Sequence, residues 1–138
     1  MPQTTSKPLP APIIAIAGWV LPGLGYWLIG QRTRALTVGL VILAMFAFGM
    51  LVGGMRVADA PDSPQTILAK PWFIGQALVG PVGLYSAHYA SVNDFPISQN
   101  HVHEIGTLYT AVAGMLNLMA IMDASYRAGA ASEEEPEE

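Results

Sequence analysis

Two histidines and a glutamate stand close together in the second half of the chain, as His101, His103 and Glu104, with Asp94 a few positions earlier. Imidazole nitrogens and carboxylate oxygens are ligands for divalent metals, and side chains that alternate along an extended segment point to one side. His101 and His103 are therefore the candidate metal ligands. No compact third-ligand motif accompanies them, so we expect a polar loop at a membrane surface and no metal site.

The other routes to chemistry have less support in the sequence. His88 stands near the end of an apolar segment, where it could be an axial haem ligand or a proton carrier, but such a histidine is typical of a hydrogen bond at the membrane interface. The chain has no cysteine, which excludes thiolate sites and disulfides. No Lys-Ser/Thr pair follows the glycines, and no serine has a base at hand. The sequence predicts neither an enzyme nor a cofactor.

Polar residues inside or beside an apolar segment are costly and need a reason. Asn117 stands near the middle of the last such segment, where a hydrogen bond between helices contributes on the order of 1 kcal/mol. We expect Asn117 to serve helix packing rather than a transport path. Asp123 stands at the end of the segment and is expected to pair with Arg127, four residues later.

These residues are carried by a strongly apolar chain of 138 residues, of which 52% are hydrophobic and 12% charged. A helix needs roughly 20 residues to cross a hydrocarbon core of about 30 Å. Four apolar blocks approach that length: residues 12–29, 35–55, 72–90 and 105–122. A soluble four-helix bundle would need a polar stripe on each helix, but the second block carries no charge. We predict an all-α integral membrane protein with about four transmembrane helices.

The first and third blocks are interrupted. Pro22 stands in the first and Pro81 in the third, and proline removes a backbone donor from a helix. Glycines accompany both prolines: Gly23 and Gly25 in the first block, and Gly80 and Gly83 in the third. The carbonyl that proline frees needs a partner in lipid, so both interruptions should face other helices.

Small residues recur at four-residue spacing in the second and fourth blocks. Such spacing places them on one helix face and lets two helices approach closely. The predicted packing residues are Gly49 and Gly53 in the second block, and Gly106 and Gly114, with Thr110 between them and Asn117 beyond, in the fourth.

The two ends of the chain are polar. Residues 1–11 read as a flexible lead-in, residues 12–127 as one transmembrane domain, and residues 128–138 as a disordered acidic tail. The first apolar block continues into LPGLG and arginines instead of a cleavage site, so no secretory signal is expected. The net charge of −4 leaves no basic face for nucleic acid.

Four spans would place both termini on one side of the cell membrane. That side would also hold the second loop, with Lys7, Arg56, Lys70 and Arg127, while Arg32 and Arg34 would lie opposite in a short turn. Because basic residues favour the cytoplasmic side, both termini are predicted to be cytoplasmic.

Residues 23–32, GLGYWLIGQR, resemble the hairpin of the small two-transmembrane-helix domain proteins, in which glycines, aromatics and a basic turn join two spans. The sequence departs from that pattern at Tyr26, Leu28 and Ala35. The whole chain more closely resembles a bacterial family of short multi-spanning membrane proteins of unknown function. The resemblance implies a membrane fold without an activity, and the residues that carry the hairpin are Pro22, Gly23, Gly25, Gly30 and Arg32.

The sequence favours a non-enzymatic integral membrane protein whose partners are the lipid bilayer and either itself or other membrane subunits. The alternative is a small transporter or channel component with a path lined by the interrupted helices. That alternative predicts that Gln76, His88 and Asn117 converge on one cavity.

Overall fold

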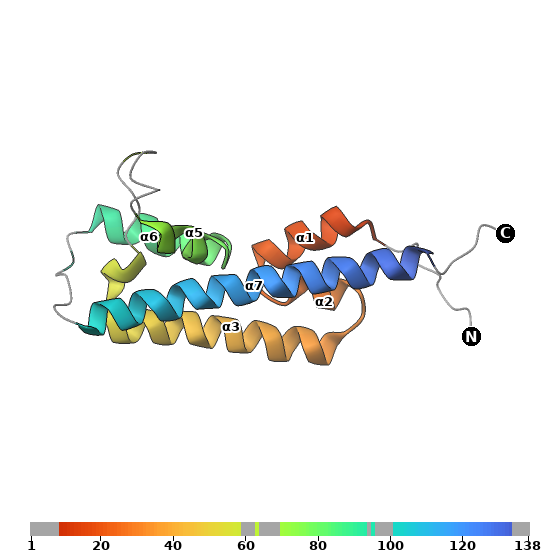
Figure 1. Ribbon diagram of the computed structural model, residues 1–138, viewed down its shortest axis with the longest axis horizontal. Helices are drawn as coiled ribbons and strands as arrows, with labels where there is room; N and C mark the ends of the chain where they lie inside the picture. Colours follow the sequence, from red (N-terminus) through yellow and green to blue (C-terminus); the bar gives the residue numbers. More distant parts are fainter. Residues whose placement is uncertain (1–8, 59–62, 64–69, 94, 96–100, 134–138) are drawn as a thin grey trace.

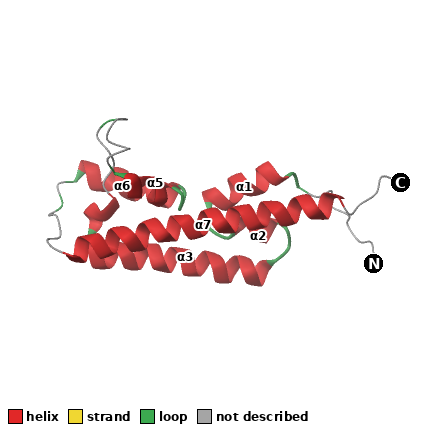
Figure 2. Ribbon diagram, viewed as in Figure 1, coloured by secondary structure: helices red, strands yellow, loops and turns green. Residues whose placement is uncertain are grey.

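The computed structural model describes residues 9–58, 63, 70–93, 95 and 101–133. In these ranges every regular element is a helix, which confirms the all-α prediction for this part of the chain (Figure 2). Most of the predicted lead-in and the end of the acidic tail, residues 1–8 and 134–138, lie outside the described residues.

Two long helices form the body of the molecule. These are α3 (Arg32–Gly53) and α7 (His101–Glu133), which run side by side along the longest axis in Figure 1. They are antiparallel, because Gly53 at the end of α3 lies against Gly106 near the start of α7. Both are long and apolar enough to cross a membrane.

The first apolar block is a hairpin of two short helices, α1 (Ala11–Val20) and α2 (Leu24–Leu28). The chain turns between them at Pro22, which has no N–H to continue a helix, and at Gly23, whose φ of +89° is unfavourable for other residues. After the turn α2 folds back along α1, so that Gly25 packs against Ile14.

The third block repeats this arrangement. A short 3₁₀ helix, η1 (Met55–Ala58), follows α3, and beyond it α5 (Pro71–Ala77) and α6 (Pro81–Val92) form a second hairpin. The reversal occurs at Gly80, whose φ is +98°, directly before the Pro81 that opens α6. The returning α6 packs on η1.

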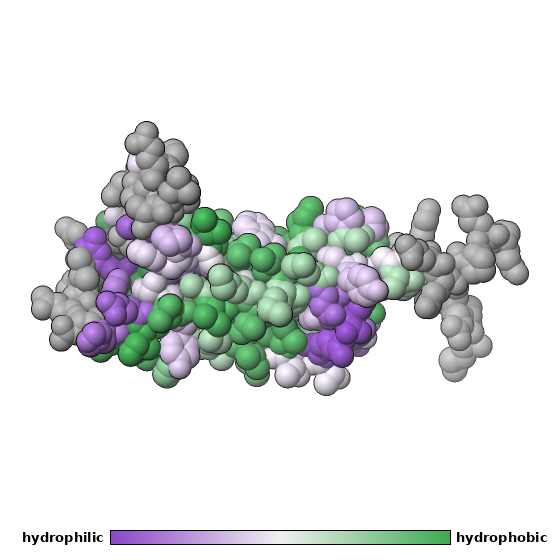
Figure 3. All heavy atoms as spheres, viewed as in Figure 1, coloured by the Kyte–Doolittle hydropathy of each residue, from purple (hydrophilic) through white to green (hydrophobic). Residues whose placement is uncertain are grey.

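The prediction of four transmembrane helices is therefore not confirmed, although both interruptions fall where predicted. Each interruption reverses the chain instead of kinking a continuous helix. The α1–α2 hairpin enters from the end of the molecule where α7 finishes, and the α5–α6 hairpin enters from the opposite end (Figure 1). The two turns meet near the middle of α7. In Figure 3 a mostly apolar band lies between two more hydrophilic ends.

The last helix is longer than the apolar block that predicts it. It begins at His101 instead of Ile105 and continues to Glu133, past the predicted domain end at residue 127. Residues 128–133 of the predicted tail are thus helical, and this extension begins with Ala128, which is buried in a core cluster with Ile14 and Tyr26.

Candidate functional site

The two hairpins are joined through Asn117, which stands in the middle of α7 and is completely buried. Its Nδ2 atom donates to the carbonyl oxygen of Gly18 in α1 at 3.2 Å and to that of Leu78 at the end of α5 at 2.8 Å. One amide group thus bonds to both hairpins. We call Asn117 and its two carbonyl partners the Asn117 clamp.

The two hairpin tips also touch each other directly. The indole Nε1 of Trp19 in α1 donates to the carbonyl oxygen of Ala77 in α5 at 3.1 Å. Gly80 lies so close to the Trp19 carbonyl that a side chain there would collide with it. At the tips of the two hairpins the backbone of one therefore packs directly against the backbone of the other.

Gln76 is also completely buried, but it makes a separate contact. Its Nε2 donates to the Val57 carbonyl oxygen and to Thr110 Oγ1, both at 2.8 Å, and so joins α5 to η1 and α7. His88 lies on the exposed side of α6. The transport alternative predicts that Gln76, His88 and Asn117 converge on one cavity. In the structure they do not.

The space beside the Asn117 clamp is small. About 150 Å³ lies among α1, α2 and α7, too narrow to admit a water molecule; its lining residues include Gly18, Gly25, Tyr26 and Asn117. The Oδ1 of Asn117 and the Oε1 of Gln76 have no hydrogen-bond partner among the described residues. The geometry of this region can hold helices together, but it leaves no room for a ligand of molecular size.

Glycines bring the long helices into backbone contact. A Cβ atom on Gly49 would lie 2.9 Å from the carbonyl oxygen of Gly106, and one on Gly53 would lie 2.8 Å from the Gly106 Cα. Gly114 lies against the Gly75 carbonyl, where a side chain would collide with backbone. The predicted packing glycines thus face other helices, and Gly75 is a partner that the sequence pattern did not single out.

A polar cluster lies where α2 and α7 meet, in the half of the molecule where α7 finishes. The Tyr26 hydroxyl donates to Asp123 Oδ2 at 2.7 Å, and Arg127 Nε donates to the same oxygen at 2.7 Å. The predicted pairing of Asp123 with Arg127 is confirmed. The Arg34 guanidinium lies over the Tyr26 ring, 5.8 Å from its centroid.

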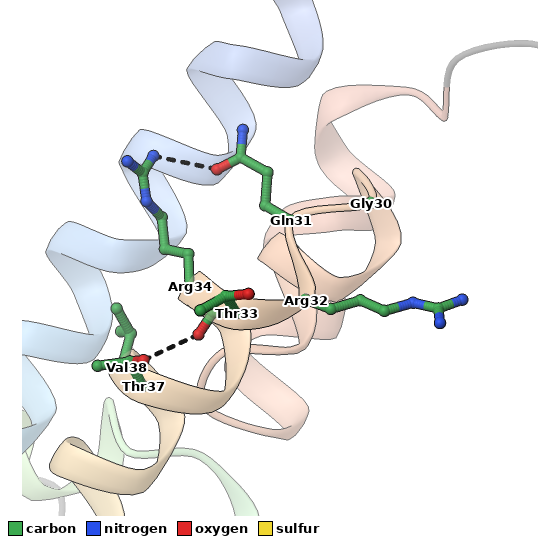
Figure 4. Close-up of a pocket in the computed structure, with 7 residues that line it drawn as sticks. All are labelled: Gly30, Gln31, Arg32, Thr33, Arg34, Thr37 and Val38. Carbon is green, nitrogen blue, oxygen red and sulfur yellow. Dashed lines mark hydrogen bonds between the residues drawn. The ribbon is translucent and has the colours of Figure 1, made fainter.

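Of the remaining predicted hairpin residues, two are buried and two lie at the surface. Pro22 and Gly23 are buried against α3, where the Pro22 carbonyl contacts Gly39 and Gly23 contacts Ala35. Gly30 and Arg32 lie at the surface, at the start of α3, beside an open hollow of about 640 Å³ (Figure 4). Seven residues line this hollow: Gly30, Gln31, Arg32, Thr33, Arg34, Thr37 and Val38.

The histidines do not lie on an extended segment. His101 and His103 belong to the first turn of α7, where residues two apart point in different directions. His101 is exposed, and its Nδ1 lies 3.5 Å from an oxygen of Glu104. Asp94 lies outside the described residues. Among those described, no group of three or more metal-ligating side chains comes together.

Comparison with known proteins identifies a family. The sequence model of DUF6677, a family of unknown function, matches residues 13–136. No curated protein and no solved structure matches the chain.

Proposed function

The chain belongs to the DUF6677 family of unknown function, so its task must be inferred from its own geometry, and we propose that it is a non-enzymatic integral membrane protein with an architectural role. It would act as an accessory or structural subunit, embedded in the cell membrane and packed against a second copy or a larger membrane complex.

Its proposed topology has α3 and α7 crossing the bilayer, with the two hairpins re-entering from opposite sides. The length and apolar character of α3 and α7 support this topology, as does the apolar band in Figure 3. Non-helical backbone is tolerated at membrane depth only where protein or a water-filled cavity surrounds it. The turns meet this condition, because Pro22, Gly23, Val79 and Gly80 are all buried.

The observation that carries the architectural role is the Asn117 clamp. A buried amide in the middle of a proposed span is the feature that would mark a substrate path. Here both of its N–H groups bond to hairpin carbonyls, and the adjacent space is too narrow for water. Gln76 is likewise bonded to η1 and α7.

The hairpins change the basis for the proposed membrane orientation. Because the first block reverses, Arg32 and Arg34 share an end with Arg127, while Arg56 and Lys70 belong to the other end. This differs from the distribution expected for four spans. Basic residues near the spans still favour the end with both termini, which we propose to be cytoplasmic.

The experiment for this role is purification of the tagged full chain from its native membrane in a gentle detergent, followed by native mass spectrometry. We expect a stoichiometric assembly, either with another membrane subunit or with further copies of the chain. A chain that is monomeric and without a partner under conditions that preserve known membrane complexes would contradict the architectural role.

The second candidate is a small transporter or channel component. It is favoured by the two interrupted helices whose tips meet inside the protein, since broken helices form the binding sites of many transporters. Reconstitution into liposomes with ion-sensitive dyes would distinguish the two roles. The architectural role predicts no flux above that of empty liposomes, and flux that is abolished by Asn117→Leu would favour transport.

A further inference from the structure

Two exposed arginines stand at the start of α3. Arg32 and Arg34 are exposed, and within the described part of the chain neither lies within 4 Å of a carboxylate. Arg127 differs, because it is paired with Asp123. Arg34 donates a hydrogen bond to a neutral acceptor, the Oε1 of Gln31 at 3.0 Å, and Arg32 lies over the Trp27 ring. Neither arginine is therefore neutralised by a carboxylate in contact with it among the described residues, although Arg34 also interacts electrostatically with Asp123 from a distance.

The hollow in Figure 4 lies beside these arginines. Its volume of about 640 Å³ is enough for a phosphate-bearing headgroup. In Figure 4 Arg34 and Gln31 lie on one side and Arg32 extends to the other, with Thr33 between them and Thr37 one turn further along α3. The Thr37 hydroxyl donates to the Thr33 carbonyl, whereas the Thr33 hydroxyl is left to donate elsewhere.

The surface of α3 continues from this hollow as an exposed apolar face. Val41 follows Thr37 by four residues and Phe48 follows Val41 by seven, so all three share one side of the helix. Val41 is 53% and Phe48 50% exposed. A free phosphate would use only the arginines. A molecule with an anionic head and an apolar chain would use the arginines and this face together.

We propose that this surface binds the phosphate of an anionic phospholipid, with its acyl chain along Val41 and Phe48. Arg34 contacts the phosphate oxygens, to which guanidinium groups donate well, and the Thr33 hydroxyl adds a donor, while Arg32 adds positive charge from the other side of the start of α3. Trp27, 44% exposed beside Arg32, suits the headgroup level at which tryptophan collects. The inference rests on the proposed membrane location, and it adds a ligand to the architectural role.

The test uses the full chain in detergent and titrates it with phosphatidylglycerol, with phosphatidylcholine and with inorganic phosphate, reading lipid adducts by native mass spectrometry. Arg32→Gln/Arg34→Gln is compared with Arg56→Gln/Lys70→Gln, which removes the same charge at the opposite end. Circular dichroism verifies that both are folded, and Arg32→Lys/Arg34→Lys retains the charge if the glutamine pair fails to fold. Two basic residues at about 1 kcal/mol each predict a loss of roughly 30-fold in phosphatidylglycerol affinity for the first variant.

The control pair should change that affinity by less than about twofold, and the lysine pair should keep most of it. Equal loss in both glutamine pairs, equal binding of phosphatidylcholine, or competition by millimolar inorganic phosphate would overturn the proposal. Binding that appears only after deletion of residues 134–138 would assign the arginines to the acidic tail instead. Alkaline extraction of membranes tests the membrane location separately: a chain released by it would contradict both proposals, and a retained chain leaves the lipid titration decisive.

Discussion

The Nδ2 atom of Asn117 lies 2.8 Å from the carbonyl oxygen of Leu78, and through this bond the long helix α7 holds the turn of the second hairpin. The same atom also bonds to the Gly18 carbonyl in the first hairpin, 3.2 Å away. These two carbonyls belong to helices that end inside the protein, where water is not available to replace a lost donor. One side chain of α7 therefore contributes to the position of both hairpins.

Replacing Asn117 with alanine should lower the stability of the fold. Two carbonyl oxygens would lose their donor, and hydrogen bonds between membrane helices contribute about 1–2 kcal/mol in model systems. We expect the free energy of unfolding in detergent to fall by about that amount. Met119→Ala removes a side chain that is 66% exposed on the same helix, and it should have a smaller effect. Equal losses for the two variants would show that the clamp does not stabilise the fold.

Gly114→Ala should disturb the contact between α7 and α5. The new Cβ atom would collide with the Gly75 carbonyl, which is backbone and cannot rotate away. Overpacking of this kind costs about 1–3 kcal/mol, which a thermal unfolding midpoint would register. Gly129→Ala is the matched control on the same helix, since no atom lies within 4 Å of its Cβ position. It should be neutral or stabilising because alanine has the higher helix propensity.

Tyr26→Phe removes the hydroxyl that donates to Asp123 and leaves the buried ring in place. We expect a loss of about 0.5–1.5 kcal/mol in the free energy of unfolding. Tyr126→Phe, at a position 77% exposed, should be close to neutral. In a double-mutant cycle with Asp123→Ala the two losses should not add, because both variants break the same bond. Strict additivity would contradict this assignment.

The sequence predicts the interruptions well but not their direction. Pro22 and Pro81 locate both breaks because the missing N–H and the fixed φ act locally. A break allows either a kink or a reversal, and which one occurs depends on contacts distant in sequence, such as Gly80 with Trp19. Hydropathy counts apolar residues without regard to chain direction. An apolar block of 18 residues is therefore compatible with one span or with a short hairpin.

The same limit applies to the candidate site. A packing role for Asn117 follows from the cost of an amide in an apolar segment. The partners of Asn117 cannot be predicted in this way, because Gly18 is 99 residues away and the bonds go to backbone carbonyls, which every residue has. The Trp19 bond to Ala77 is missed for the same reason, since an indole in an apolar block predicts burial or an interface equally well. The prediction that His101 and His103 lie in an extended loop is wrong, because α7 begins at His101, before the first residues of the apolar block.

The central claim is that two helices cross the membrane and two hairpins re-enter from opposite sides. The chain contains no cysteine, so single cysteines at Thr33, Ser63 and Ala131 can be probed with a membrane-impermeant maleimide in sealed vesicles of known orientation. The account predicts that the probes at Thr33 and Ala131 react from one side and the probe at Ser63 from the other. Reaction at Thr33 from the side opposite to Ala131, as four spans require, would contradict the re-entrant hairpins.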